Sequence, residues 1–260
     1  GPCAGEGRVL FVPQEAEGKT LTLRADPHKM MEDTLRAKSV VRVGLVSSVP
    51  EGWPEVRLKA FGPRSSSSIR VVCYNILAPT YARTQVATRE MYPYCPPTAL
   101  ALDYRQPMLG RELTRLDGDL VFLQECSFST CRKFLSPVFG DTYHVRITLK
   151  ASQVCEGCAL LVRKSAFEIV EEKDVLFRSI LLSSPAFRTQ LRELKAKWPD
   201  FLTGILPHMP AIFQLGVLRH VATGELVVVA NTHLFFHPQA RHIRLLQVMC
   251  LLQQVKELQE

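Results

Sequence analysis

A run of four apolar residues that ends in an amide and a carboxylate constrains the fold of this chain more than any other feature. Leu120–Glu125 reads Leu-Val-Phe-Leu-Gln-Glu. A strand that is apolar on both faces is typical of the interior of an α/β sheet, where other layers cover both sides. Ligands of such sheets gather beyond the carboxyl ends of the strands. The run therefore predicts a central strand that ends by carrying Glu125 into a functional site.

Two more strands are predicted to end on a polar side chain. Ile69–Asn75 stops on an amide, and Leu226–His233 stops on an imidazole. Each residue alone has an ordinary structural explanation, because Asn makes turns, a core His is usually hydrogen-bonded and a strand-end Glu can be salt-bridged. Together, an Asn, a Glu and a His that converge from three strand ends suit a divalent cation acting on a phosphate.

Two aromatic residues follow His233 directly. Phe235 and Phe236 can stack on nucleic-acid bases, although core packing explains at least one of them equally well. We retain Phe235 and Asn231 as candidates for substrate contact.

The charge of the chain favours an anionic partner, of which nucleic acid is the commonest. Its net charge is +7 and its sequence pI is about 9.1, but the Lys and Arg residues are scattered rather than clustered. No apolar stretch approaches the roughly 20 residues of a membrane span, so no membrane partner is expected, and nothing indicates an obligate protein partner. The chain begins with Gly and carries no recognisable targeting peptide, so we expect a processed or partial start.

The eight cysteines are scattered, and one pair has the spacing of metal ligands. Cys155 and Cys158 are separated by two residues, but a structural zinc site usually needs a second such pair, which the chain lacks. A strand-like segment follows Cys158, whereas a thioredoxin-like redox pair opens a helix. We interpret the cysteines as reduced thiols of an intracellular protein.

Composition and periodicity divide the chain into three parts: a small β-rich region at 1–62, a Ser-rich linker at 63–68, and the main region at 69–260. In the first part we expect strands at Arg8–Val12, Thr20–Arg24 and Val40–Val46 and a helix at His28–Ala37. In the main region we expect a helix at Leu102–Leu116, kinked or started late by Pro107, and a short helix at Ser129–Leu135. Strands are expected at Tyr143–Leu149, Cys158–Val162, Phe167–Phe177, Ala211–His220 and Glu225–Asn231, and amphipathic segments at Ser184–Lys197 and Arg241–Leu258.

Several motifs resemble those of the endonuclease/exonuclease/phosphatase superfamily. They are Tyr74–Ala78, Leu123–Glu125 and Asn231–Leu234 with His237-Pro238. Tyr92–Pro96, Leu102–Gln106 and Ile243–Leu245 narrow the resemblance to the deadenylase-type branch, and within it to the mitochondrial 2′,5′-phosphodiesterases. The resemblance extends from about Ile69 to the C-terminus.

The resemblance implies a four-layer α/β sandwich of two mixed sheets flanked by helices. It implies a Mg²⁺-dependent phosphodiesterase of the mitochondrial matrix that degrades 2′,5′-oligoadenylate and trims poly(A) 3′ ends. Glu125 would bind the metal, Asn75 would support the metal and phosphate site, and His233 would donate to the scissile phosphate.

The chain also departs from the pattern of the family. The later Gly-Asp-Phe-Asn and Ser-Asp-His motifs do not occur, so we expect residues 69–260 to be the N-terminal portion of a catalytic domain that is incomplete at its C-terminus. Pro79 stands where relatives usually have Asp, and Cys126-Ser127 follows Glu125 in place of an apolar residue and an acid or Arg. Two alternatives stay open: another deadenylase, abasic-site endonuclease or phosphoinositide phosphatase of the superfamily, or an inactive nucleic-acid-binding or regulatory fragment.

Overall fold

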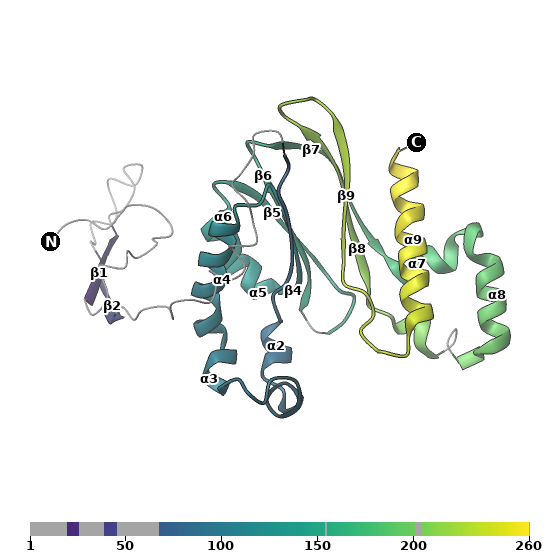
Figure 1. Cartoon of the computed structure of the whole chain (residues 1–260), viewed down its shortest axis with the longest axis horizontal. Coiled ribbons are helices and arrows are strands. Elements are labelled where there is room, and N and C mark those ends of the chain that lie inside the picture. The colour runs from purple at the N-terminus through teal and green to yellow at the C-terminus, as the bar shows by residue number, and fades with distance from the viewer. Residues whose placement is uncertain (1–19, 26–38, 46–67, 154, 201–203, 260) are drawn as a thin grey trace. The chain divides into compact units, whose positions relative to one another are not determined.

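The computed structural model describes residues 20–25, 39–45, 68–153, 155–200 and 204–259 (Figure 1). The chain divides into two compact units, residues 1–60 and 61–260. In the first unit, β1 (Thr20–Ala25) pairs antiparallel with β2 (Ser39–Leu45), in agreement with two of the predicted strands. The predicted strand Arg8–Val12, the predicted helix His28–Ala37 and all but Ser68 of the linker lie outside the described residues, so the domain boundary stays a prediction.

The second unit begins with a mixed four-stranded sheet in the order β3-β4-β6-β5. Its strands are β3 (Val71–Asn75), β4 (Leu120–Ser127), β5 (Tyr143–Leu149) and β6 (Glu156–Arg163). β3 and β4 run parallel, whereas β6 pairs antiparallel with both β4 and β5. β4 lies in the interior of this sheet, between β3 and β6. The second sheet packs on one face and helices on the other (Figure 1), so the apolar residues of β4 are covered on both faces, and Leu120, Val121 and Leu123 are at most 3% exposed. The predicted central strand is confirmed.

A second sheet packs against the first. It contains β7 (Phe167–Leu176), β8 (Ile212–His220) and β9 (Leu226–Thr232) in that order. All its described pairings are antiparallel, so this sheet is not mixed as the resemblance implied. An apolar cluster joins the two sheets, with Leu120, Leu160 and Val162 from the first and Leu218 and Val229 from the second.

Helices form the two outer layers (Figure 1). Between β3 and β4 lie α2 (Pro79–Ala82), η3 (Ala87–Met91), α3 (Pro97–Leu100) and α4 (Leu102–Leu116). Between β4 and β5 lie α5 (Phe128–Thr130), η4 (Cys131–Leu135) and α6 (Ser136–Phe139). Between β7 and β8 lie α7 (Phe177–Ser183), η5 (Pro185–Phe187), α8 (Arg188–Lys197) and η7 (Leu206–His208), and α9 (Arg241–Gln259) follows β9. The resulting helix–sheet–sheet–helix arrangement confirms the predicted sandwich.

Of the two outcomes predicted for Pro107, a kink or a later start of the helix, the later start does not occur. α4 begins at Leu102 and contains Pro107, so the helix does not start late. A proline in the sixth position removes one backbone N–H donor, and the first turn is still closed by the bond from Arg105 N–H to the Ala101 carbonyl at 3.1 Å.

The long final helix covers the outer face of the second sheet. Ile243, Leu246 and Cys250 of α9 are at most 5% exposed, in one cluster with Phe213 and Leu215 of β8. Burial of each large apolar side chain in such a layer contributes about 1.5–3 kcal/mol. Among the helices that the structure describes, none combines the length and the apolar character needed to cross a membrane.

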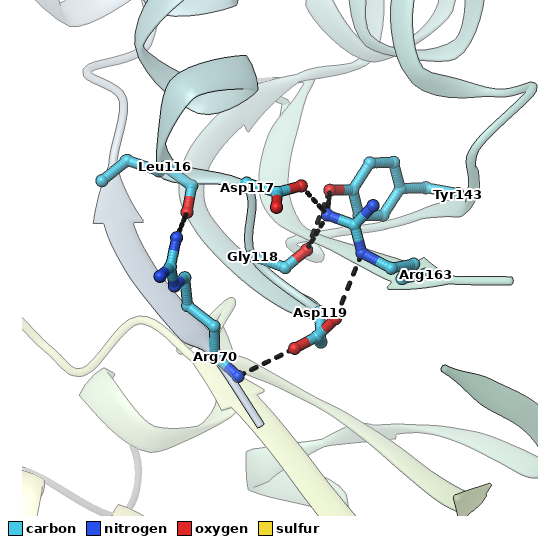
Figure 2. Close-up of polar contacts among 7 residues, drawn as sticks. All are labelled: Arg70, Leu116, Asp117, Gly118, Asp119, Tyr143 and Arg163. Atoms are coloured by element: carbon cyan, nitrogen blue, oxygen red, sulfur yellow. Dashed lines mark hydrogen bonds and ion pairs between the residues drawn. The ribbon is translucent and has the colours of Figure 1, made fainter. Parts of the chain in front are cut away.

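Charged residues close one end of the first sheet, at the start of β3 and β4 (Figure 2). The Arg163 guanidinium, at the end of β6, donates to Asp117, to the Gly118 carbonyl and to the Tyr143 hydroxyl, and it pairs with Asp119 at 3.2 Å. Asp119 also accepts from the backbone N–H of Arg70 at 2.9 Å. We call Arg70, Asp117, Asp119, Tyr143 and Arg163 the far-end cluster, because Asn75 and Glu125 lie toward the other end of β3 and β4.

Candidate active site

Asn75, Glu125 and His233 lie together at the carboxyl ends of β3 and β4. The Asn75 side-chain N–H donates to Glu125 Oε1 at 2.7 Å, and His233 Nε2 lies 3.9 Å from the same oxygen. Asn75 is the last residue of β3, and His233 follows the last residue of β9 rather than belonging to that strand. Three segments far apart in the sequence therefore deliver one amide, one carboxylate and one imidazole to a single site.

The sequence predicted that Glu125 ends its strand. In the structure it lies within the strand, at an irregularity. β4 continues to Ser127, and its pairing with β6 shifts between Gln124 and Cys126. Glu125 has a φ of 55°, a left-handed conformation that costs a non-glycine residue about 1–2 kcal/mol. A bulge of this kind redirects a side chain, and here it turns the carboxylate toward the loop after β3. The second oxygen, Oε2, accepts from the backbone N–H of Ala78 at 3.1 Å.

The loop after Asn75 is held by hydrogen bonds from both sides. Leu77, at a φ of 54°, donates its backbone N–H to Asn75 Oδ1 at 2.9 Å. Arg105 of α4 donates to the carbonyls of Ile76 and Leu77 at 2.8 and 3.0 Å, and to that of Leu100 at 3.0 Å. Burial lowers the pKa of Arg105, but a guanidinium remains charged in proteins. The sequence indicated no role for Arg105 beyond its place in a matching motif.

His233 is neutral near pH 7. Burial lowers its pKa below the ordinary value of 6.5, the positive charge of Lys150 adds to that effect, and Glu125 and Glu156 oppose it. Its Nδ1 atom is buried and has no hydrogen-bond partner among the described residues. The imidazole can therefore act as a neutral donor or acceptor beside the Glu125 carboxylate.

A second charged group, which sequence reasoning missed, lies beside these residues. Glu156 at the start of β6 is 1% exposed, and its Oε1 accepts from Lys150 Nζ at 2.6 Å and from the Tyr81 hydroxyl at 2.8 Å. Burial and the bond to Glu156 raise the pKa of Tyr81, so its phenol stays protonated. A signal was present, since Glu156 precedes the apolar run of β6 as closely as Glu125 follows the apolar run of β4.

The two candidates for substrate contact occupy different surroundings. Asn231 is 3% exposed, and it bonds to Gln124 at 2.9 Å, to Gln214 at 3.2 Å and to the Ala159 carbonyl at 3.0 Å. These bonds connect the two sheets, and they use both the oxygen and the nitrogen of the Asn231 side-chain amide. Phe235 is half-buried against the cluster beneath α9. Substrate contact by Asn231 or Phe235 stays a prediction, and packing between layers accounts for both positions.

The Glu125 carboxylate oxygens fit a divalent cation that keeps several water ligands better than one coordinated entirely by protein side chains. Each carboxylate oxygen accepts one N–H, from Asn75 and from Ala78, which leaves lone pairs on both. Mg²⁺ is commonly held by one or two carboxylates together with waters and substrate phosphates. Among the described residues, no group of three or more His, Cys, Asp or Glu side chains is placed to hold an ion, and the seven described cysteines are free thiols.

Curated proteins are similar in sequence to about three quarters of this chain. The 2′,5′-phosphodiesterase 12 of Bos taurus is 36% identical over 189 residues, which are 72% of this chain and 30% of the relative. The Homo sapiens protein of that name is 35% identical over 189 residues, with the same coverage. The 3′-5′-exoribonuclease subunit Ccr4 of the Candida albicans CCR4-Not complex is 27% identical over 204 residues, 75% of this chain and 24% of the relative. The chain thus spans about 30% of the length of 2′,5′-phosphodiesterase 12, and no family model matches it.

Solved structures share the fold. ANGEL2, described as a 2′,3′-cyclic phosphatase, superposes with a TM-score of 0.57 at 21% identity over 73% of this chain and 48% of that structure. The human Nocturnin catalytic domain superposes with a TM-score of 0.52 at 17% identity, over 73% of this chain and 58% of that structure. An endonuclease/exonuclease/phosphatase family protein from Bacteroides thetaiotaomicron superposes with a TM-score of 0.50 at 18% identity, over 73% of this chain and 58% of that structure. The chain is therefore homologous to part of the 2′,5′-phosphodiesterase 12 and Ccr4 proteins and has the fold of the endonuclease/exonuclease/phosphatase superfamily.

Proposed function

We propose that this chain carries part of the active site of a divalent-metal-dependent phosphodiesterase that hydrolyses 2′,5′-oligoadenylate and shortens poly(A) from the 3′ end. The names of its homologues, a 2′,5′-phosphodiesterase and a 3′-5′-exoribonuclease, support this reaction class and an RNA substrate. The net charge of +7 supports a polyanionic substrate. Mg²⁺ as the metal and the mitochondrial matrix as the compartment are part of the proposal and come from the motif resemblance.

The observation that carries the proposal is the convergence of Asn75, Glu125 and His233 within one site. Glu125 would hold the cation, and Asn75 fixes the orientation of that carboxylate through its 2.7 Å bond. The neutral His233 would donate a hydrogen bond to an oxygen of the scissile phosphate. A bound Mg²⁺ would neutralise charge on the phosphate and lower the pKa of a water.

A second function, binding of adenylate without turnover, is favoured by one specific observation. Among the described residues, no group of three or more His, Cys, Asp or Glu side chains is placed to hold an ion, whereas phosphodiester hydrolysis often uses a pair of bound metal ions. The test must therefore separate binding from hydrolysis.

The experiment is Mg²⁺-dependent hydrolysis of 2′,5′-triadenylate and of a 3′,5′-linked oligoadenylate by the 260-residue chain. It is run beside Glu125→Ala and beside Glu168→Ala, a matched control whose carboxylate is 68% exposed on β7. Turnover by the wild type should be retained in the control and should fall at least a hundredfold in Glu125→Ala. Oligoadenylate binding without turnover would select the second function, and neither binding nor turnover would refute both.

A further inference from the structure

The hairpin formed by β5 and β6 places a lysine at the same end of the sheet as Glu125. Lys150 follows the last residue of β5 and Glu156 is the first residue of β6, and the Lys150 backbone N–H donates to the Glu156 carbonyl at 2.9 Å. Gly157 tightens this contact, because a side-chain carbon there would lie 2.0 Å from the Thr148 carbonyl oxygen. Register puts Glu156 opposite Ser127, two residues beyond Glu125.

A buried carboxylate such as that of Glu156 carries a large desolvation penalty. A carboxylate that is 1% exposed destabilises the fold unless it is paired and hydrogen-bonded. Lys150 and Tyr81 both donate to Oε1, whereas Oε2 is buried without a partner among the described residues. A network built for stability alone would satisfy both oxygens. The arrangement is explained if the function of Glu156 is to fix the position of the Lys150 ammonium group.

The Lys150 ammonium group retains N–H donors for which the described residues show no acceptor. An ammonium has three N–H donors, and within the described residues the ion pair with Glu156 accounts for one of them. The side chain is 15% exposed, so its tip can be reached by a ligand. Tyr81, which also donates to Glu156, lies three residues after Ala78, whose backbone N–H donates to Glu125, so the Lys150–Glu156 pair adjoins the catalytic candidates. The positive charge of Lys150 correspondingly helps to lower the pKa of His233. A fixed cation with free donors suits the oxygen atoms of a phosphate.

We propose that Lys150, held by Glu156, is a phosphate-binding residue of this site, which contacts a phosphodiester group of the oligonucleotide beside the scissile one. The inference rests on the proposed function, because it assumes an oligoadenylate in the site. Glu156 is a positioning residue in this arrangement, and Tyr81 shares in fixing Glu156.

The test is equilibrium binding of a 3′-labelled oligoadenylate in EDTA, where no metal-dependent cleavage occurs, measured by fluorescence anisotropy at several salt concentrations. The decisive variant is the double substitution Lys150→Met with Glu156→Gln, which removes both charges, leaves the net charge unchanged and strands no buried ion. Lys164→Met is the control, because Lys164 is a lysine at the other end of β6, bonded to the Gly140 carbonyl at 2.7 Å. Circular dichroism confirms that each variant is folded.

The double variant is expected to bind oligoadenylate five- to tenfold more weakly than the wild type. The slope of log affinity against log salt should become shallower by about 0.7, the value for one phosphate contact on a single strand. If Lys150 and Glu156 were a structural pair only, the double variant would match the wild type in affinity and slope, and that result would overturn the inference. Absence of binding by the wild type would instead refute the proposed function, so the two failures are distinguishable.

Discussion

The two ends of the first sheet carry similar residues and use them differently. At the far-end cluster, the Asp119 side chain is 4% exposed; it forms an ion pair with Arg163 and accepts a hydrogen bond from the Arg70 backbone N–H (Figure 2). At the site end, Glu156 and His233 each keep one buried polar atom without a partner among the described residues, and Glu125 is held at a positive φ. At the far end Arg163 Nε also lacks a hydrogen bond, but it lies 3.2 Å from an Asp119 oxygen and so stays paired with an opposite charge. This difference is expected if the first end holds the fold and the second binds a ligand.

The far-end cluster should give the largest loss of stability. Arg163→Met leaves Asp119 buried without its cation, so we expect the free energy of unfolding to fall by about 3–5 kcal/mol in urea titrations. The control is Arg219→Met, whose pair with Glu168 spans 4.0 Å between half-exposed or exposed side chains and should cost less than about 1 kcal/mol. Oligoadenylate affinity of folded Arg163→Met should equal that of the wild type. A loss at Arg163 no larger than at Arg219 would remove the contrast between the two ends.

Metal addition tests the site end. We expect Mg²⁺ to stabilise the wild type by about 2.7 kcal/mol at a concentration one hundred times its dissociation constant. Glu125→Gln keeps an acceptor for the Ala78 N–H but loses the charge, so its melting temperature should not respond to Mg²⁺. Thermal melts in Mg²⁺ and in EDTA measure the response of the wild type and of Glu125→Gln, and Glu168→Gln is the control. An equal Mg²⁺ response in the wild type and Glu125→Gln would place the cation elsewhere.

How far the sequence predicts this site depends on whether a residue's position is set by its own strand. Asn75, Glu125 and His233 were found because each follows an apolar run, and the ends of such runs meet at one edge of a sheet. Glu156 was missed although it stands just before an apolar run, and Lys150 was missed because its contact with Glu156 depends on the β5–β6 register, which the sequence does not specify before pairing is known. The bulge at Glu125 and the antiparallel second sheet are likewise products of tertiary pairing.

Arg105 should show an intermediate effect, because it acts on the site through the backbone. Arg105 uses two nitrogens, Nε toward the Leu100 carbonyl and Nη1 toward those of Ile76 and Leu77. Lysine has all its donors on one nitrogen and cannot reproduce both positions, so Arg105→Lys should cost about 2 kcal/mol of unfolding free energy. The loop would also hold Glu125 less firmly, and the Mg²⁺ response should shrink. Arg115→Lys, at an exposed position on the same helix, is the control. A normal Mg²⁺ response in Arg105→Lys would limit Arg105 to a structural role.

The smallest expected effect is the pH dependence contributed by His233. Because burial lowers its pKa in the folded state, the unfolded chain binds the proton more readily, and stability should fall as the pH drops from about 6.5 through the folded pKa. Urea titrations in EDTA between pH 7.5 and 5 should show the wild type losing stability relative to His233→Gln by no more than about 1.4 kcal/mol per pH unit. His144→Gln, at an exposed position, is the control for the loss of an imidazole. Parallel curves for the wild type and His233→Gln would mean that the imidazole titrates as freely in the folded protein as in water, and the site end would then lack its buried neutral donor.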